Sequence, residues 1–156
     1  MPRPIMYLEA PILHFSLEGL LPKDHWLALN CELGTLVLLS TKNDTAHPLL
    51  LTERQFTANE LFLILPLLQS FPTYCPYEIL LASFASGDTT DLGIERAREQ
   101  LHEALKAGLW DQQMRPVRNT LSRARSKIRA FGLEINPILE VGYVLMPASS
   151  LRRPQG

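Results

Sequence analysis

The residues with the clearest chemical potential lie in one short stretch, RPVRNTLSRARSKIRAF, at positions 115–131. This stretch holds six Lys and Arg residues and no Asp or Glu. Guanidinium and ammonium groups bind phosphate oxygens, and Arg and Asn can also pair with the edges of bases. Ser and Thr hydroxyls add further hydrogen-bonding groups. Side chains of these types could therefore bind an anionic polymer such as a nucleic acid.

The positive charge of this stretch stands out because the rest of the chain is acidic. Residues 1–114 hold 7 Lys and Arg against 14 Asp and Glu, whereas residues 115–156 hold 8 against 2. The formal net charge of the 156-residue chain is only −1, so the total hides this asymmetry. Such a separation of charge predicts a basic surface for an anionic partner.

Helical periodicity predicts an amphipathic helix over residues 116–131. At 100° per residue, Val117, Leu121, Ala124, Ile128 and Phe131 fall on one apolar stripe that would pack in a core. The remaining faces are basic or hydrogen-bonding and would point to solvent. The candidate DNA-binding residues are Arg115, Arg118, Asn119, Thr120, Ser122, Arg123, Arg125, Ser126, Lys127 and Arg129.

The N-terminal third reads as β-structure that would support this helix. Short apolar runs at 12–17, 26–33 and 35–40 predict strands, followed by a turn at 41–48 and a return strand from 49. We therefore expect an antiparallel sheet within residues 1–50.

Two helices and a hairpin complete the expected core. Thr52 and Gln55 form a capping-box pattern for the first helix, which Pro66 should kink or stop. The second helix should start at 75–76, with Pro76 at its first position. The chain after the basic helix should form a β-hairpin over 133–146, with its turn at 136–137.

A further amphipathic helix is expected at 91–109, between the second helix and the basic one. Gly108 would close it, and Glu95, Glu99 and Glu103 give it an acidic side. A charged helix face is most often only a solvated surface. The alternative is that these three glutamates contact a protein partner.

Several motifs, in this order, resemble the OmpR/PhoB-type winged helix-turn-helix family: LTERQF…EL, CPYEILLASF, VRNTLSRARSKI and VGYVL. The resemblance covers roughly residues 33–147. It implies an α+β fold with an N-terminal antiparallel sheet, three core helices, an extra helix between the second and third, and a C-terminal β-hairpin wing. The expected division is a sheet over 1–50, a winged-helix DNA-binding region over 51–147 with the inserted helix 91–109, and a flexible tail over 148–156.

The resemblance implies a transcriptional regulator that binds double-stranded DNA sequence-specifically. Helix 116–131 would enter the major groove and hairpin 133–146 would act as the wing. The chain departs from the family pattern at 118–120, where Arg-Asn-Thr replaces Asp-Val-His, and in the wing, which lacks arginines. These departures leave an alternative, a winged-helix adaptor that binds RNA polymerase or another regulator. A homodimer would suit tandem half-sites.

Enzymatic and membrane functions find no support in the sequence. The four His residues are scattered, the two Cys are too few for a disulfide scaffold or a zinc site, and no catalytic motif is present. We therefore expect no enzyme, no metal and no cofactor. The longest apolar run, residues 61–68, is far shorter than the ~20 residues of a membrane helix. With no signal peptide recognised either, we expect a cytoplasmic protein.

Overall fold

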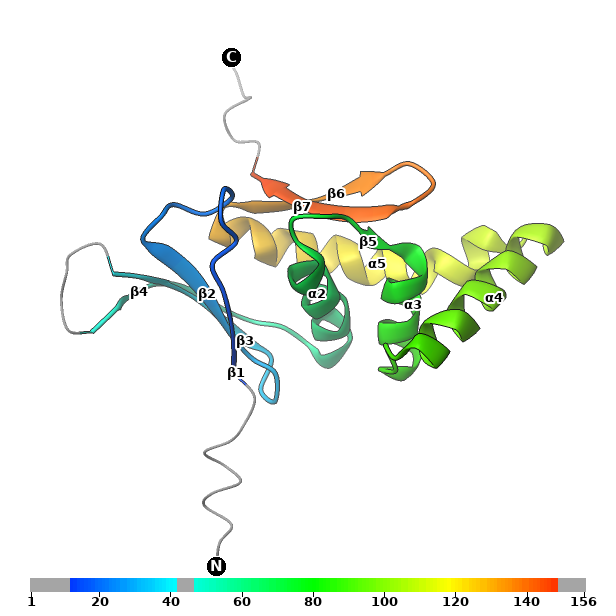
Figure 1. Ribbon diagram of the computed structural model, residues 1–156, viewed down its shortest axis with the longest axis horizontal. Helices are drawn as coiled ribbons and strands as arrows, with labels where there is room; N and C mark the ends of the chain where they lie inside the picture. Colours follow the sequence, from blue (N-terminus) through cyan, green and yellow to red (C-terminus); the bar gives the residue numbers. More distant parts are fainter. Residues whose placement is uncertain (1–11, 42–46, 149–156) are drawn as a thin grey trace, which may run out of the picture.

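The computed structural model describes residues 12–41 and 47–148, which form a mixed α+β fold (Figure 1). The element order is four strands, three helices with a short strand between the first two, a long fourth helix, and a C-terminal hairpin. The general α+β class is as predicted. Most of the expected turn at 41–48 and of the tail at 148–156 lies outside the described residues.

The N-terminal strands form one antiparallel sheet in the order β1-β2-β3-β4. Their bounds are Ile12–Phe15, His25–Asn30, Thr35–Ser40 and Leu49–Gln55. The first two strands are shorter than predicted, and the third is confirmed. Alternate residues of β2 and β3, namely Leu27, Leu29, Leu36 and Leu38, are buried and give the sheet an apolar inner face.

The predicted start of the first helix is wrong, because Thr52–Gln55 belongs to β4. This segment pairs with β3 as far as Gln55 opposite Thr35. Helix α2 (Ala58–Ser70) begins after Thr57, which forms a different capping box with Glu60. Thr57 Oγ1 accepts from the Glu60 amide at 3.2 Å, and Glu60 Oε1 accepts from the Thr57 amide at 2.9 Å. This reciprocal pair satisfies two amides at the helix start.

The sequence predicts that Pro66 kinks or stops the first helix, and Pro66 lies inside α2 without stopping it. The proline is itself buried, and helix α2 continues to Ser70 before the chain turns at Phe71 and Pro72. Burial of Leu63, Ile64, Leu67 and Leu68 on either side of the proline outweighs the loss of one backbone hydrogen bond.

The next two helices follow the sequence closely. Cys75–Pro76 forms a short strand, β5, and Pro76 is the N-cap of α3 (Tyr77–Ser86) rather than its first residue. Gly87 ends α3 with a φ of 72°. The inserted helix α4 (Asp91–Ala107) starts with its amides capped by Thr90 and ends at Gly108, also left-handed, as expected.

Helix α5 spans Trp110–Ile128 and is longer at its start than the predicted 116–131 helix. Pro116 lies within it, in its second turn. A short 3-10 turn, η1 (Arg129–Phe131), then leads to Gly132. The basic stretch therefore begins inside a helix, and its last three residues lie in a tighter turn.

The C-terminal hairpin consists of β6 (Leu133–Ile138) and β7 (Gly142–Pro147). Asn136 and Pro137 are paired within β6, so the predicted turn at this position is wrong. The chain reverses instead at 139–141, where Glu140 has a φ of 67°. Strand β7 also pairs with β5, which gives a small sheet in the order β5-β7-β6.

One hydrophobic core joins these parts. It extends from the inner face of the N-terminal sheet through α2 and α3 to α5 and the hairpin. Leu29, Ile64, Val117, Ile128 and Ile135 are all completely buried. Strand β4 runs across the expected boundary at residue 50 and leads directly to α2. The sheet and the helices also pack on the same core. This core fixes which face of α5 is turned outward.

Candidate nucleic-acid interface

The apolar stripe of α5 is buried as the periodicity predicts. Val117, Leu121, Ala124 and Ile128 are at most 2 % exposed, and Met114 extends the stripe toward the start of the helix. Packing against α2, α3 and the hairpin fixes the rotation of α5 about its axis. The opposite face is thereby directed to solvent.

Five predicted residues share this outer face and are exposed: Arg115, Asn119, Ser122, Arg123 and Ser126. Arg118 lies at its edge and is half-buried. The Arg118 guanidinium is 3.6 Å from the carboxylate of Asp111, two turns earlier in α5. Because Asp111 is largely exposed and Arg118 is partly exposed, this pair contributes little and leaves Arg118 available to another anion.

Thr120 lies on the buried side of α5, among the core residues, and is only 3 % exposed. Its Oγ1 accepts a hydrogen bond of 3.2 Å from the guanidinium of Arg123. The structure thus places Thr120 beneath the exposed face rather than on it. This hydrogen bond helps to hold the Arg123 side chain in place.

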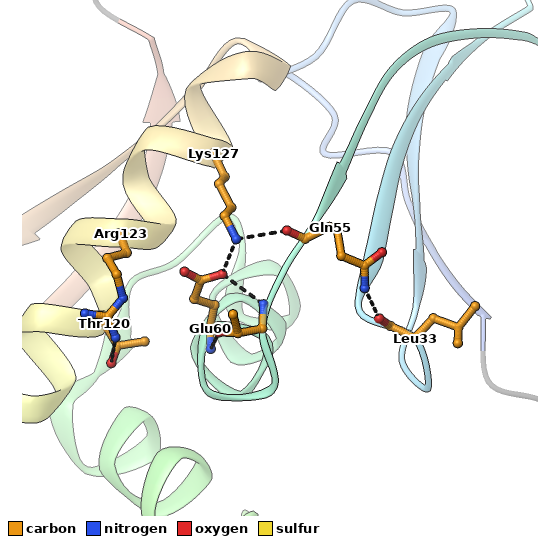
Figure 2. A network of polar contacts seen from close by, with 7 residues as sticks. Leu33, Gln55, Glu60, Thr120, Arg123 and Lys127 are labelled. Atoms are coloured by element: carbon orange, nitrogen blue, oxygen red, sulfur yellow. Dashed lines mark hydrogen bonds and ion pairs between the residues drawn. The ribbon is translucent and has the colours of Figure 1, made fainter.

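Lys127 points away from the outer face and toward the start of α2 (Figure 2). Its Nζ is 2.6 Å from Glu60 Oε1 and donates to the backbone oxygen of Gln55 at 2.9 Å. It also lies 5.4 Å from the centre of the Phe56 ring. Lys127 therefore ties α5 to the junction of β4 and α2.

Glu60, which the sequence analysis did not single out, is the centre of this network. Its side chain is 2 % exposed. Burial acts to raise the pKa of Glu60. The hydrogen bond and positive charge of Lys127, together with the hydrogen bonds to Thr57, outweigh burial, so the pKa of Glu60 is lowered. The T-A-N-E pattern at 57–60 could have identified the cap but not its cation, which lies 67 residues away along the chain.

The two arginines near the end of the helix share a second buried carboxylate, Glu134 of β6. Arg129 binds both Glu134 oxygens, at 2.9 and 3.2 Å, and Arg125 lies 3.6 Å from one of them. The hydrogen bond from Arg129 is the main reason that the pKa of Glu134 is lowered. Arg125 and Arg129 stay at the surface, but their charge is largely balanced within the fold.

The acidic residues of α4 do not form a single uniform patch. Glu95 pairs with Arg98, which also contacts Glu78 of α3 at 3.4 Å. Glu99 and Glu103 line an open groove of about 840 Å³ together with Arg96, Ala107, Leu109 and Gln113. The predicted protein-contact residues are therefore solvent-exposed and lie beside a mixed polar surface.

The arrangement as a whole offers a rigid helix whose exposed side carries guanidinium, amide and hydroxyl groups and no acidic residue between 115 and 126. Among the described residues, no group of three or more His, Cys, Asp or Glu side chains is placed to hold a metal ion. No helix within residues 12–41 and 47–148 is long and apolar enough to cross a membrane.

Comparison with known proteins adds no relative from which a function could be transferred. No family model matches the chain, and neither a curated protein nor a solved structure shows a significant match. The functional argument therefore rests on the residues and their geometry.

Proposed function

We propose that this protein is a transcriptional regulator that binds double-stranded DNA sequence-specifically through the outer face of α5. The observation that carries this proposal is the composition of that face. Three arginines, an amide and two hydroxyls lie on one side of a helix whose other side is fixed in the core. An α-helix fits the major groove, where Arg and Asn can read base edges and hydroxyls can contact phosphates.

The proposed contact set is smaller than the sequence indicates. It comprises Arg115, Arg118, Asn119, Ser122, Arg123 and Ser126, with Arg125 and Arg129 at its end. Thr120 and Lys127 are left out, because the first is buried and the second is bound to Glu60.

The surrounding elements support a winged-helix arrangement. Helices α2 and α3 pack against α5, and a hairpin follows it and pairs with the short strand β5 before α3 (Figure 1). In such an arrangement α5 would be the recognition helix and β6–β7 the wing. The proposed wing differs from a DNA-gripping one, because residues 133–148 contain no Lys or Arg.

Fluorescence anisotropy with duplex DNA of randomised sequence, measured over a salt series, tests the proposal. Each neutralised phosphate adds about 0.9 to the slope of log K against log salt, so Arg118→Ala/Arg123→Ala should reduce the slope by about 2. Arg54→Ala/Arg96→Ala removes the same charge from exposed positions on β4 and α4 and should leave the slope nearly unchanged. Selection from the bound pool should then enrich one sequence.

Failure of the wild-type protein to bind duplex DNA even at low salt would refute DNA binding. Equal losses in the two double variants would refute the assignment to α5, because they would reflect only net charge.

The second candidate is a winged-helix adaptor that binds RNA polymerase or another regulator. The lack of Lys and Arg in the hairpin and the exposed glutamates of α4 favour it. Charge reversal at Glu95, Glu99 and Glu103 should leave DNA affinity intact if α4 serves a protein contact. Loss of DNA binding in that variant would contradict the separation of the two roles.

A further inference from the structure

An apolar groove is lined by residues of α3, α4, the start of α5 and the tip of the β6–β7 hairpin. In Figure 1 these elements lie together away from the four-stranded sheet. Its volume is about 500 Å³. A hollow of about 260 Å³ adjoins it and extends it along α4. The residues that define this groove are Tyr77, Arg98, His102, Leu105, Trp110 and Glu140.

A protruding leucine stands beside this groove. Leu139, at the tip of the hairpin, is 85 % exposed, and Leu105 of α4 is 63 % exposed. The floor is aromatic, because the rings of Tyr77 and Trp110 pack edge to face with centroids 5.3 Å apart. Scattered exposed leucines are ordinary, but a protruding leucine next to an apolar hollow with aromatic walls is typical of a contact surface.

The polar groups on the rim occur in a matching order. On α4, Arg98, His102 and Leu105 share one face at spacings of four and three. On the hairpin, Leu139 is followed by Glu140. Within the described residues, neither His102 nor Glu140 has a hydrogen-bond or ion-pair partner. On the hairpin a leucine is thus followed by an acid, and on α4 two bases are followed by a leucine.

We propose that the occupant of this groove is a second copy of the same chain, in a two-fold dimer. Leu139 of each copy would pack on Leu105 and Trp110 of the other, and Glu140 would lie beside Arg98 and His102. A two-fold interface requires one surface that is complementary to itself, and this groove carries both the protrusion and the hollow, both the acid and the bases.

The dimer would leave the proposed DNA face of α5 uncovered. Trp110 and Arg115 are five residues apart, which places them about 140° apart around the helix. The dimer does not depend on DNA binding and is measured without DNA, so the two proposals can fail separately.

Sedimentation velocity of the whole chain, at roughly 1 to 200 µM, tests the dimer in the range where the Kd of a modest interface falls. The wild type should shift from monomer to dimer over this series. Leu139→Glu and Leu105→Glu should each raise the dimer Kd by about 30-fold or more, as expected for a central apolar contact. Leu33→Glu is the matched control, because Leu33 is also 63 % exposed but lies in the turn between β2 and β3. A wild type that stays monomeric, or a dimer that the control weakens as much as the groove variants, would overturn the proposal.

Disulfide trapping tests the geometry even if a glutamate variant folds poorly. In a Cys31→Ser background, Cys75 is the one remaining native thiol and is completely buried. A mixture of Leu139→Cys and Leu105→Cys chains should form more covalent dimer under mild oxidation than either variant alone. Equal or smaller yield from the mixture would contradict the packing of Leu139 on Leu105.

Discussion

Replacing Lys127 with Met would isolate the buried carboxylate of Glu60. The change removes the 2.6 Å ion pair, the hydrogen bond to Gln55 and the contact with the Phe56 ring while keeping most of the side-chain volume. Removing one partner of a buried ion pair costs about 3–5 kcal/mol, because the other charge stays buried without compensation. Lys127 is 31 % exposed and therefore partly screened, so we expect the lower end, about 3 kcal/mol.

The loss should depend on pH in a defined direction. In the wild type the pKa of Glu60 is lowered on folding, so its stabilising effect is present above the unfolded pKa and is lost as the pH falls through the folded pKa. Without Lys127, burial is opposed only by the Thr57 cap, and we expect the pKa of Glu60 to rise. The protonated form then fits the site, so the difference between variant and wild type should shrink toward about pH 4.

Urea denaturation followed by circular dichroism, at about pH 7 and pH 4, measures this difference. Glu60→Gln keeps an oxygen for the Thr57 amide and removes the charge, so Glu60→Gln/Lys127→Met should be more stable than Lys127→Met alone. Lys106→Met, on the exposed side of α4, is the matched control and should change the free energy of unfolding by less than about 0.5 kcal/mol.

Two results would refute this reasoning. One is a loss below about 1 kcal/mol for Lys127→Met at pH 7, the value of an exposed pair. The other is additivity of the two single changes in the double variant, since contacting residues should couple.

Two further changes test elements that hold α5 in place. Gly142→Ala should destabilise the protein by about 1–3 kcal/mol, because a Cβ would lie 2.0 Å from the Cys75 carbonyl oxygen where β7 pairs with β5. A thermal melt no different from that of the wild type would show that β5 and β7 can move apart without loss of stability. Thr57→Ala should lower the free energy of unfolding by about 1 kcal/mol through loss of the α2 cap, measured by urea denaturation, whereas Thr73→Ala, in the turn after α2, should cost less.

Local patterns were reliable where one period or one stop signal dominated. The stripe from Val117 to Ile128 predicted which side of α5 is buried, and Gly108 marked the end of α4. These features depend on residues within a few turns of each other. They can therefore be predicted from the sequence without knowing the fold.

Local patterns failed where two signals competed. Thr52 and Gln55 form as good a capping pattern as Thr57 and Glu60, and pairing with β3 decided that the first segment is strand. Asn136 and Pro137 read as a turn, yet they pair with β7. In both places a partner strand remote in sequence supplied the hydrogen bonds that the local pattern would have satisfied differently.

The amino-acid sequence by itself determined that this chain concentrates positive charge on one amphipathic helix and which side of that helix is apolar. Only the tertiary structure decided which of these charges pair with carboxylates inside the fold. Glu60 of α2 and Glu134 of β6 bind Lys127, Arg125 and Arg129, while within residues 12–41 and 47–148 no buried carboxylate pairs with Arg115, Arg118 or Arg123. The physical reason is that charge pairing depends on distance in space. The core packs both α2, which precedes α5 in the sequence, and β6, which follows it, against α5.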